Sequence, residues 1–157
     1  MRAEAFAVRH HVWANQQMAA FVRSVGPEAG RLRLDGTYGS VESTLEHLAT
    51  ADSACLRLLC GGERFEAALQ ERLQRNGVRW MEFLEQDFDP EARLTVHRRI
   101  QLPPVLDVPA GIVLAQALGH AADHRAQIAV TLSCNGIDPP ELDVWAFALR
   151  EGHATAQ

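Results

Sequence analysis

The chain contains no lysine, and aromatic side chains make up only 6% of its 157 residues. All 15 basic residues are arginine, and 20 acidic residues give a formal net charge of −5 at pH 7. An acidic chain of this kind lacks the basic footprint that nucleic-acid-binding proteins use. We therefore expect no nucleic-acid partner, and we expect a core built mainly from aliphatic and alanine side chains.

Cysteine and long apolar runs are also scarce. The three cysteines, Cys55, Cys60 and Cys134, are odd in number and show no Cys-x-x-Cys spacing, so they do not indicate a disulfide framework. No apolar run is long enough to cross a bilayer. The first residues also lack the basic and apolar pattern of a signal peptide. These absences predict free thiols, no membrane partner and a cytoplasmic location.

The length and the hydrophobic content of 47% predict one domain with a sizeable core. We place this domain at residues 1–152 and expect a disordered tail at residues 153–157, where small and polar residues follow Gly152.

Hydrophobic periodicity predicts a mainly helical chain. Apolar residues recur at helical spacing in five segments, which are residues 4–25, 41–60, 66–87, 113–136 and 141–151. Asn76-Gly77 is expected to bend or interrupt the third of these helices. For the long helix at 113–136, Asp107 is a plausible N-cap, Pro109 suits the first turn and Asn135-Gly136 is a stop signal. Residues 31–39 are predicted to form a loop.

Between the third and fourth helices the period changes to two. Apolar and polar residues alternate over residues 93–102, which predicts a strand, and residues 105–106 form a possible second short strand after Pro103-Pro104. We therefore predict an all-α fold, a four-helix bundle with a small β excursion before the last long helix and a short C-terminal helix.

The long helix carries the motif His120-Ala121-Ala122-Asp123-His124. Residues four apart lie one above the other on a helix, so the two imidazoles could hold one metal ion together. The alternative is a pair of core histidines, each with one hydrogen-bond partner, and the spacing alone does not decide between the two.

Other histidines have weaker signals. His47 lies at the edge of the apolar stripe of the second helix, where it is either a boundary residue or a third ligand. His10 and His11 point about 100° apart, so at most one faces inward, and we expect both at the surface or its boundary. One of them could donate a hydrogen bond to a ligand side chain. His97 falls on the polar side of the predicted strand and is expected to be solvated.

Several segments together resemble the DinB/YfiT-like superfamily. The block Thr44-Leu45-Glu46-His47-Leu48, with Ala51-Asp52 after it, resembles the second helix of that family. The likeness also covers four further stretches, which are residues 13–15, 36–40, 119–128 and 135–143. The resemblance implies a four-helix bundle of unusual connectivity, often a homodimer, with a divalent metal, usually zinc or nickel, held by three histidines. These ligands fall on His47, His120 and His124. Residues 61–65 are short for the crossover of the family, which leaves the helix order there open.

A metal with three imidazole ligands keeps open positions and supports Lewis-acid chemistry. Asp123 and Arg125 are the candidate catalytic residues, beside the ligands. Asp123 could handle a proton or orient a ligand ring, but a surface charge explains it equally well. Arg125 could hold a substrate carboxylate, although an exposed arginine is the commoner case. Glu46, Asp52 and Gln127 are further candidates for orienting the rings.

Relatives of this fold include transferases of low-molecular-weight thiols and a thiol-dependent isomerase. The resemblance therefore favours a metal-dependent enzyme that transfers a low-molecular-weight thiol cofactor to a small-molecule electrophile. The sequence shows no serine or cysteine in an activated setting, and a thiol transferase needs none because the cofactor brings the sulfur. A metal-dependent hydrolase is the nearest alternative. A non-catalytic metal-binding or stress-response dimer is the alternative outside the enzymes.

Overall fold

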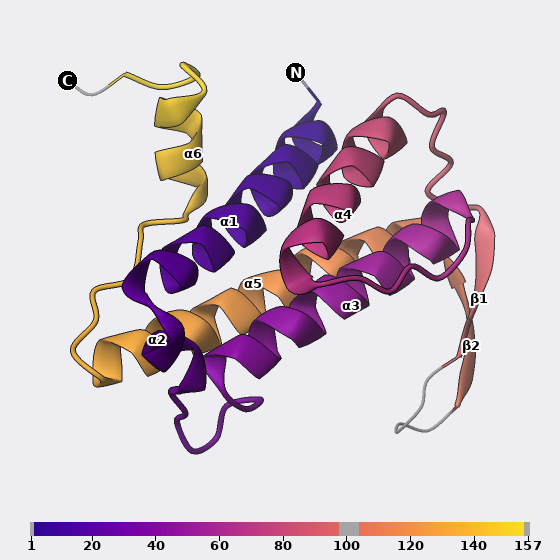
Figure 1. The fold of residues 1–157 in the computed structure, drawn as a ribbon. Helices are drawn as coiled ribbons and strands as arrows, with labels where there is room; N and C mark the ends of the chain where they lie inside the picture. The colour runs from indigo at the N-terminus through magenta and orange to yellow at the C-terminus, as the bar shows by residue number, and fades with distance from the viewer. Residues whose placement is uncertain (1, 98–103, 156–157) are drawn as a thin grey trace.

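The structure is a computed structural model that describes residues 2–97 and 104–155. Within those ranges the chain forms six helices and one two-stranded sheet, so more than half of it is helical, as predicted (Figure 1). The elements follow in the order α1 Ala3–Val25, α2 Pro27–Arg31, α3 Val41–Cys60, α4 Leu69–Leu84, β1 Arg93–His97, β2 Val105–Pro109, α5 Ala110–Cys134 and α6 Val144–Arg150.

The four long helices contact one another in a closed order. α3 packs along α5 on one side and along α4 on the other, and α1 packs against both α4 and α5 (Figure 1). The short α2 lies between α1 and α3, and α6 contacts α1. The β1–β2 hairpin extends from the end of this helical body where α5 begins. This arrangement places α3 beside α5, although a whole helix and a hairpin separate them in the sequence.

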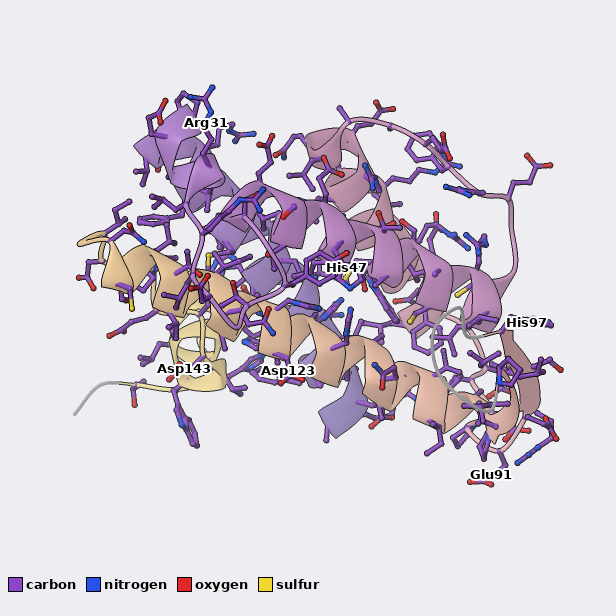
Figure 2. The ribbon with its side chains drawn as sticks, turned by 90° about the horizontal axis from the view of Figure 1, so that it is seen from below. Arg31, His47, Glu91, His97, Asp123 and Asp143 are labelled. Atoms are coloured by element: carbon purple, nitrogen blue, oxygen red, sulfur yellow. The ribbon has the colours of Figure 1, made fainter. Side chains whose placement is uncertain are left out.

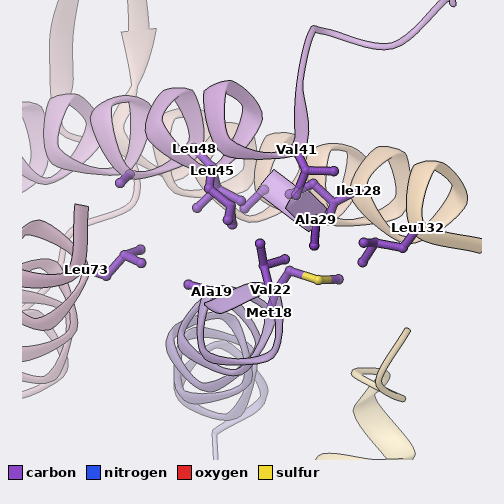
Figure 3. Packing of buried hydrophobic residues seen from close by; sticks show 12 residues of the cluster. Met18, Ala19, Val22, Ala29, Val41, Leu45, Leu48, Leu73, Ile128 and Leu132 are labelled. Carbon is purple, nitrogen blue, oxygen red and sulfur yellow. The ribbon is translucent and has the colours of Figure 1, made fainter. Parts of the chain in front are cut away.

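The core has two parts of different composition. One part is aliphatic and joins Met18 of α1, Leu45 and Leu48 of α3, and Ile128 and Leu132 of α5 (Figure 3). The other part is built around aromatic residues, with Trp80 and Phe83 of α4 packed on Val8, Leu56, Leu114 and Ala117. The expectation of an aliphatic core is therefore right for the first part only, because Trp80 is fully buried in the second.

The start of the long helix differs from the prediction. α5 begins at Ala110, with Pro109 as its N-cap, and Pro109 is also the last residue of β2. Asp107 is not a helix cap. It pairs with Thr95 in the antiparallel sheet, and its carboxylate accepts from Arg93 at 2.9 Å. The helix ends at Cys134, followed by Asn135 as C-cap and by Gly136 at a φ of 74°, as the stop signal predicted. Residues 98–102 of the predicted strand lie outside the described residues.

Two further boundaries need correction. α4 starts three residues later than predicted, and Asn76-Gly77 does not interrupt it. Asn76 is buried and donates to the Ala49 carbonyl at 2.8 Å, while Gly77 lies so close to α1 that an added Cβ would meet Gln16 and Val12. These two residues therefore serve helix packing rather than a turn. The short α2 occupies residues for which no helix was predicted, and α6 begins after Asp143, whose side chain caps it.

The cysteines and the chain end complete the description. Cys55, Cys60 and Cys134 are free thiols, and burial raises the pKa of Cys55 to about 11.

His153 donates its backbone N–H to Ala148 at 2.8 Å, so its position is defined, and residues 156–157 lie outside the described residues. The domain boundary at residue 152 stays a prediction. Among the described residues, no helix has both the length and the apolar character that crossing a bilayer requires.

Candidate metal centre

Three histidines from two neighbouring helices converge at one place. His47 comes from α3, and His120 and His124 come from successive turns of α5. The Nε2 atoms of His47 and His120 are 3.0 Å apart, and one ring nitrogen from each of the three residues lies within 4.8 Å of the others. Figure 2 shows His47 between the ribbons of α3 and α5. The fold thus brings together the ligand set that the resemblance implied.

Local sequence explains how these side chains reach the same place. Ser40 caps α3 by accepting from the Ser43 N–H at 3.1 Å, and this cap fixes the helical phase of the residues that follow. Leu45 and Leu48 point from α3 into the core, which leaves His47 at the edge of the apolar stripe, facing α5. The i, i+4 spacing on α5 then presents His120 and His124 on the same face.

Gln127 orients one of the three rings. Its Oε1 accepts from the backbone N–H of Tyr38 at 3.1 Å and lies 3.2 Å from Nδ1 of His124. An amide oxygen can only accept, so this contact assigns the proton of the neutral imidazole to Nδ1. The Nε2 lone pair of His124 is then free for a cation, which is the usual arrangement of a metal-bound histidine. Gln127 therefore has the orienting position that the sequence suggested.

Tyr38 covers the cluster from the loop before α3, and no role was predicted for it. Its ring stacks on His47, with centroids 4.1 Å apart, and meets His124 edge-on at 5.3 Å. Tyr38 is 54% exposed, so it forms part of the outer wall of the site. A tyrosine in a turn just before a helix cap, in a chain with a single tyrosine, is the signal that could have identified it.

The electrostatic setting keeps two of the imidazoles neutral. The pKa of His47 is lowered by burial and by the neighbouring His124 and His120. The pKa of His120 is also lowered, chiefly by burial, although Asp123 and Asp52 oppose the shift. Neutral imidazoles are the form that binds metal, so both shifts favour binding near neutral pH.

Comparison with known proteins gave no match to a family model, a curated protein or a solved structure. A functional assignment therefore depends on the geometry of this cluster and on the sequence motifs that form it.

The two candidate catalytic residues differ in their surroundings. Asp123 is exposed on α5, beside the histidines but on the outer side of the helix (Figure 2). Arg125 is only 9% exposed, so the exposed position considered for it is wrong. Its guanidinium donates to Asn15 of α1 at 2.5 Å, and burial lowers its pKa to about 10. The roles suggested for both residues toward a substrate stay predictions.

The other two orienting candidates have partners elsewhere. Glu46 accepts from Arg72 of α4 at 2.6 Å, and Asp52 accepts from His11 of α1 at 2.8 Å. Within the described residues, neither carboxylate is hydrogen-bonded to one of the three histidines. Gln127 is thus the orienting candidate that contacts one of the three histidine rings.

The expectation that both His10 and His11 lie at the surface or its boundary is wrong for His11. His11 is 1% exposed, while His10 is half-buried and hydrogen-bonded to the Leu142 carbonyl at 2.8 Å. The helical phase could have shown this difference. His11 is in register with Val8, Asn15 and Met18, all of which are buried on the inner face of α1.

Proposed function

We propose that this protein is a DinB/YfiT-like metal-binding protein in which His47, His120 and His124 hold one divalent cation, zinc or nickel. One observation carries the proposal, namely that three imidazoles from two helices present ligand atoms within 4.8 Å of one another. The closed packing order of α1, α4, α3 and α5 is compatible with the four-helix bundle of that superfamily. The orienting contact from Gln127 to His124 supports a ligand role over a purely structural one.

We further propose that the protein is an enzyme that transfers a low-molecular-weight thiol to a small electrophile. A divalent cation with three imidazole ligands keeps positions open and lowers the pKa of a thiol bound there. The chain leaves room for such a ligand beside His47, where Tyr38, Glu46, His47 and Thr50 line a hollow that is open to solvent. The thiol sulfur would lose its proton to solvent and form the new bond to an electrophilic carbon. The bond from that carbon to its leaving group would break, and the leaving group would depart with the electron pair and take up a proton from solvent. Tyr38 would contact the incoming molecule.

The first test is metal content. Purified wild-type protein is expected to contain about one divalent ion per chain by elemental analysis, and His47→Ala, His120→Ala and His124→Ala are each expected to lose it. His97→Ala and His153→Ala are matched controls that remove exposed histidines outside the cluster and should keep the metal. Unchanged metal content in the three cluster variants would exclude this site.

The second test is activity of the metal-loaded protein. Low-molecular-weight thiols are incubated with a panel of small electrophiles, and loss of free thiol is followed with wild type and His47→Ala. Thiol-transfer turnover that requires His47 supports the transferase. If turnover occurred only with ester or amide substrates and without thiol, the protein would be a metal-dependent hydrolase and not a thiol transferase. Metal binding without any turnover would leave a non-catalytic metal-binding protein, and sedimentation analysis would show whether that protein is the homodimer that the resemblance implies.

A further inference from the structure

A second cavity lies on the other side of α3 from α5. Its volume is about 250 Å³, and its walls come from α3, from the segment 63–67 and from α4. Five arginines line it, which is a third of the arginines in an otherwise acidic chain. They are Arg57, Arg64, Arg72, Arg75 and Arg79. Nothing in the proposed thiol chemistry requires this concentration of positive charge.

Carboxylates neutralise only two of the five arginines. Arg72 is paired with Glu46 at 2.6 Å, and Arg64 is paired with Glu66 at 2.8 Å. Within the described residues, Arg57, Arg75 and Arg79 have no carboxylate within ion-pair distance. The remaining acidic side chain in the lining, Glu63, is exposed. The cavity therefore has an excess of positive charge.

The helix termini do not remove this excess. Arg57 lies in the last turn of α3, where the negative end of the helix dipole stabilises a cation. Arg79 also reaches this end of α3, because it donates to the carbonyl of the C-cap Gly61. Arg75 lies inside α4, away from its ends, and has no such compensation. Like charges collected around one small cavity repel one another, so a bound anion would lower the energy of the arrangement.

Contacts to the protein hold several of these guanidinium groups in place. Arg79 donates to the Gly61 carbonyl at 2.6 Å, and Arg75 lies 3.8 Å above the centre of the Phe65 ring. Arg72 donates to Thr50 at 2.6 Å and to the Ala67 carbonyl at 2.9 Å. Side chains that are already ordered lose less conformational entropy when a ligand binds.

We propose that this cavity binds the phosphate group of a small phosphorylated molecule. Planar guanidinium groups bind phosphate oxygens in pairs, and a phosphate dianion matches several unpaired cations better than a singly charged carboxylate does. The volume suits a compact ligand rather than a polymer. Thr50 lines both this cavity and the hollow beside His47, so the two share part of one wall on α3. The proposal does not require that a metal binds at the histidine cluster.

The test is calorimetric titration of the purified protein with inorganic phosphate in low-chloride buffer. Wild type is expected to bind one phosphate per chain, and Arg57→Gln and Arg75→Gln are each expected to weaken binding about tenfold or more. Arg75→Lys keeps the charge and should still bind more weakly than wild type, because the planar group is lost. Arg31→Gln is the matched control, since Arg31 is exposed and paired with Glu28 outside the cavity. Circular dichroism checks that each variant is folded.

Four outcomes would overturn the proposal. The first is the absence of saturable phosphate binding by the wild type. The second is equal affinity in wild type and in both glutamine variants. The third is loss of phosphate binding in His47→Ala together with unchanged binding in Arg57→Gln, which would place the anion at the histidine cluster. The fourth is an acetate affinity equal to that of phosphate, which would show a carboxylate site instead, because acetate is expected to compete only weakly.

Discussion

At the scale of single residues, Gln127 shows how one side chain orients a candidate ligand. Its amide oxygen accepts from the Tyr38 backbone and from His124 Nδ1, so it links the loop before α3 to the histidine cluster. Such supporting contacts fix both the tautomer and the direction of a ligand ring. Removing the contact should leave the ligand present but poorly oriented.

We therefore predict that Gln127→Leu lowers metal affinity by about 10- to 100-fold, the range typical for loss of a partner of a metal-bound histidine. The measurement is competition of the metal-loaded protein against a chelator with a coloured metal complex. Gln70→Leu is the control, because Gln70 is exposed on α4 and bonded only to Arg23. Equal affinities of the two variants would show that Gln127 does not orient His124.

Single residues also show what the sequence can and cannot predict about the site. The spacing of His120 and His124 predicted a shared face because helical geometry is local. The role of Tyr38 could not be deduced in this way, because its stacking on His47 depends on how the loop folds back over α3. The burial of His11 could have been predicted from the sequence, since His11 has the same helical phase as other buried residues of α1.

At the scale of elements, a buried polar pair joins α1 to α3. His11 and Asp52 are hydrogen-bonded at 2.8 Å, and their side chains are only 2% and 5% exposed. Asn15, one turn after His11, contacts Arg125 of α5. Polar groups in a core need their partners, because an unpaired buried charge is costly. These contacts therefore specify how α1 sits against α3 and α5.

We predict that Asp52→Ala lowers the free energy of unfolding by about 1–3 kcal/mol, the usual cost of leaving a buried hydrogen-bonding group without its partner. The double variant His11→Leu/Asp52→Leu should be more stable than Asp52→Ala, because neither partner is left unpaired. Urea unfolding followed by circular dichroism measures both.

The control is Glu28→Ala, which breaks the exposed pair with Arg31 and should change the free energy of unfolding by less than about 1 kcal/mol. Asp52→Ala should also retain metal, since Asp52 is bonded to His11 and not to a ligand ring. If Asp52→Ala had the same free energy of unfolding as Glu28→Ala, the buried pair would not stabilise the fold. If Asp52→Ala lost its metal, Asp52 would again be a candidate for orienting a histidine of the cluster.

Element boundaries were predicted well where the signal is local. The bounds of α3 agree with the prediction because Ser40 caps it and glycines follow it. Asp107 and Asn76-Gly77 were misread because tertiary contacts decide their conformation. Asp107 pairs with β1, and the Gly77 position is packed against α1, neither of which a local pattern reveals.

At the scale of the whole molecule, the site depends on the pairing of α3 with α5. His47 and His120 are 73 residues apart, and no periodicity predicts that their rings meet. The packing of α3 against α5 brings the two rings together. The sequence suggested this meeting through the family resemblance and not through the spacing of the residues. The phosphate cavity depends on the same kind of information, because its arginines come from two helices and the segment between them.

The same packing makes the stability of the metal-free protein depend on pH. Burial is the main cause that lowers the pKa of His10 on α1, His47 on α3 and His120 on α5 below the value of 6.5 that they have in the unfolded chain. Below pH 6.5 the unfolded chain therefore binds protons that the folded protein does not. The free energy of unfolding must then rise with pH through this window and fall as the pH decreases.

We predict that metal-free protein in chelator loses stability steadily between pH 7 and pH 5.5, before most carboxylates begin to titrate. Urea unfolding at each pH gives the slope. His47→Asn and His120→Asn should each flatten it, because each removes a group that binds its proton less readily when folded. His97→Asn changes an exposed histidine of β1 and should leave the slope as in wild type. A stability that is constant or that increases toward pH 5.5 would show that the histidine cluster is not held in its neutral form by the fold.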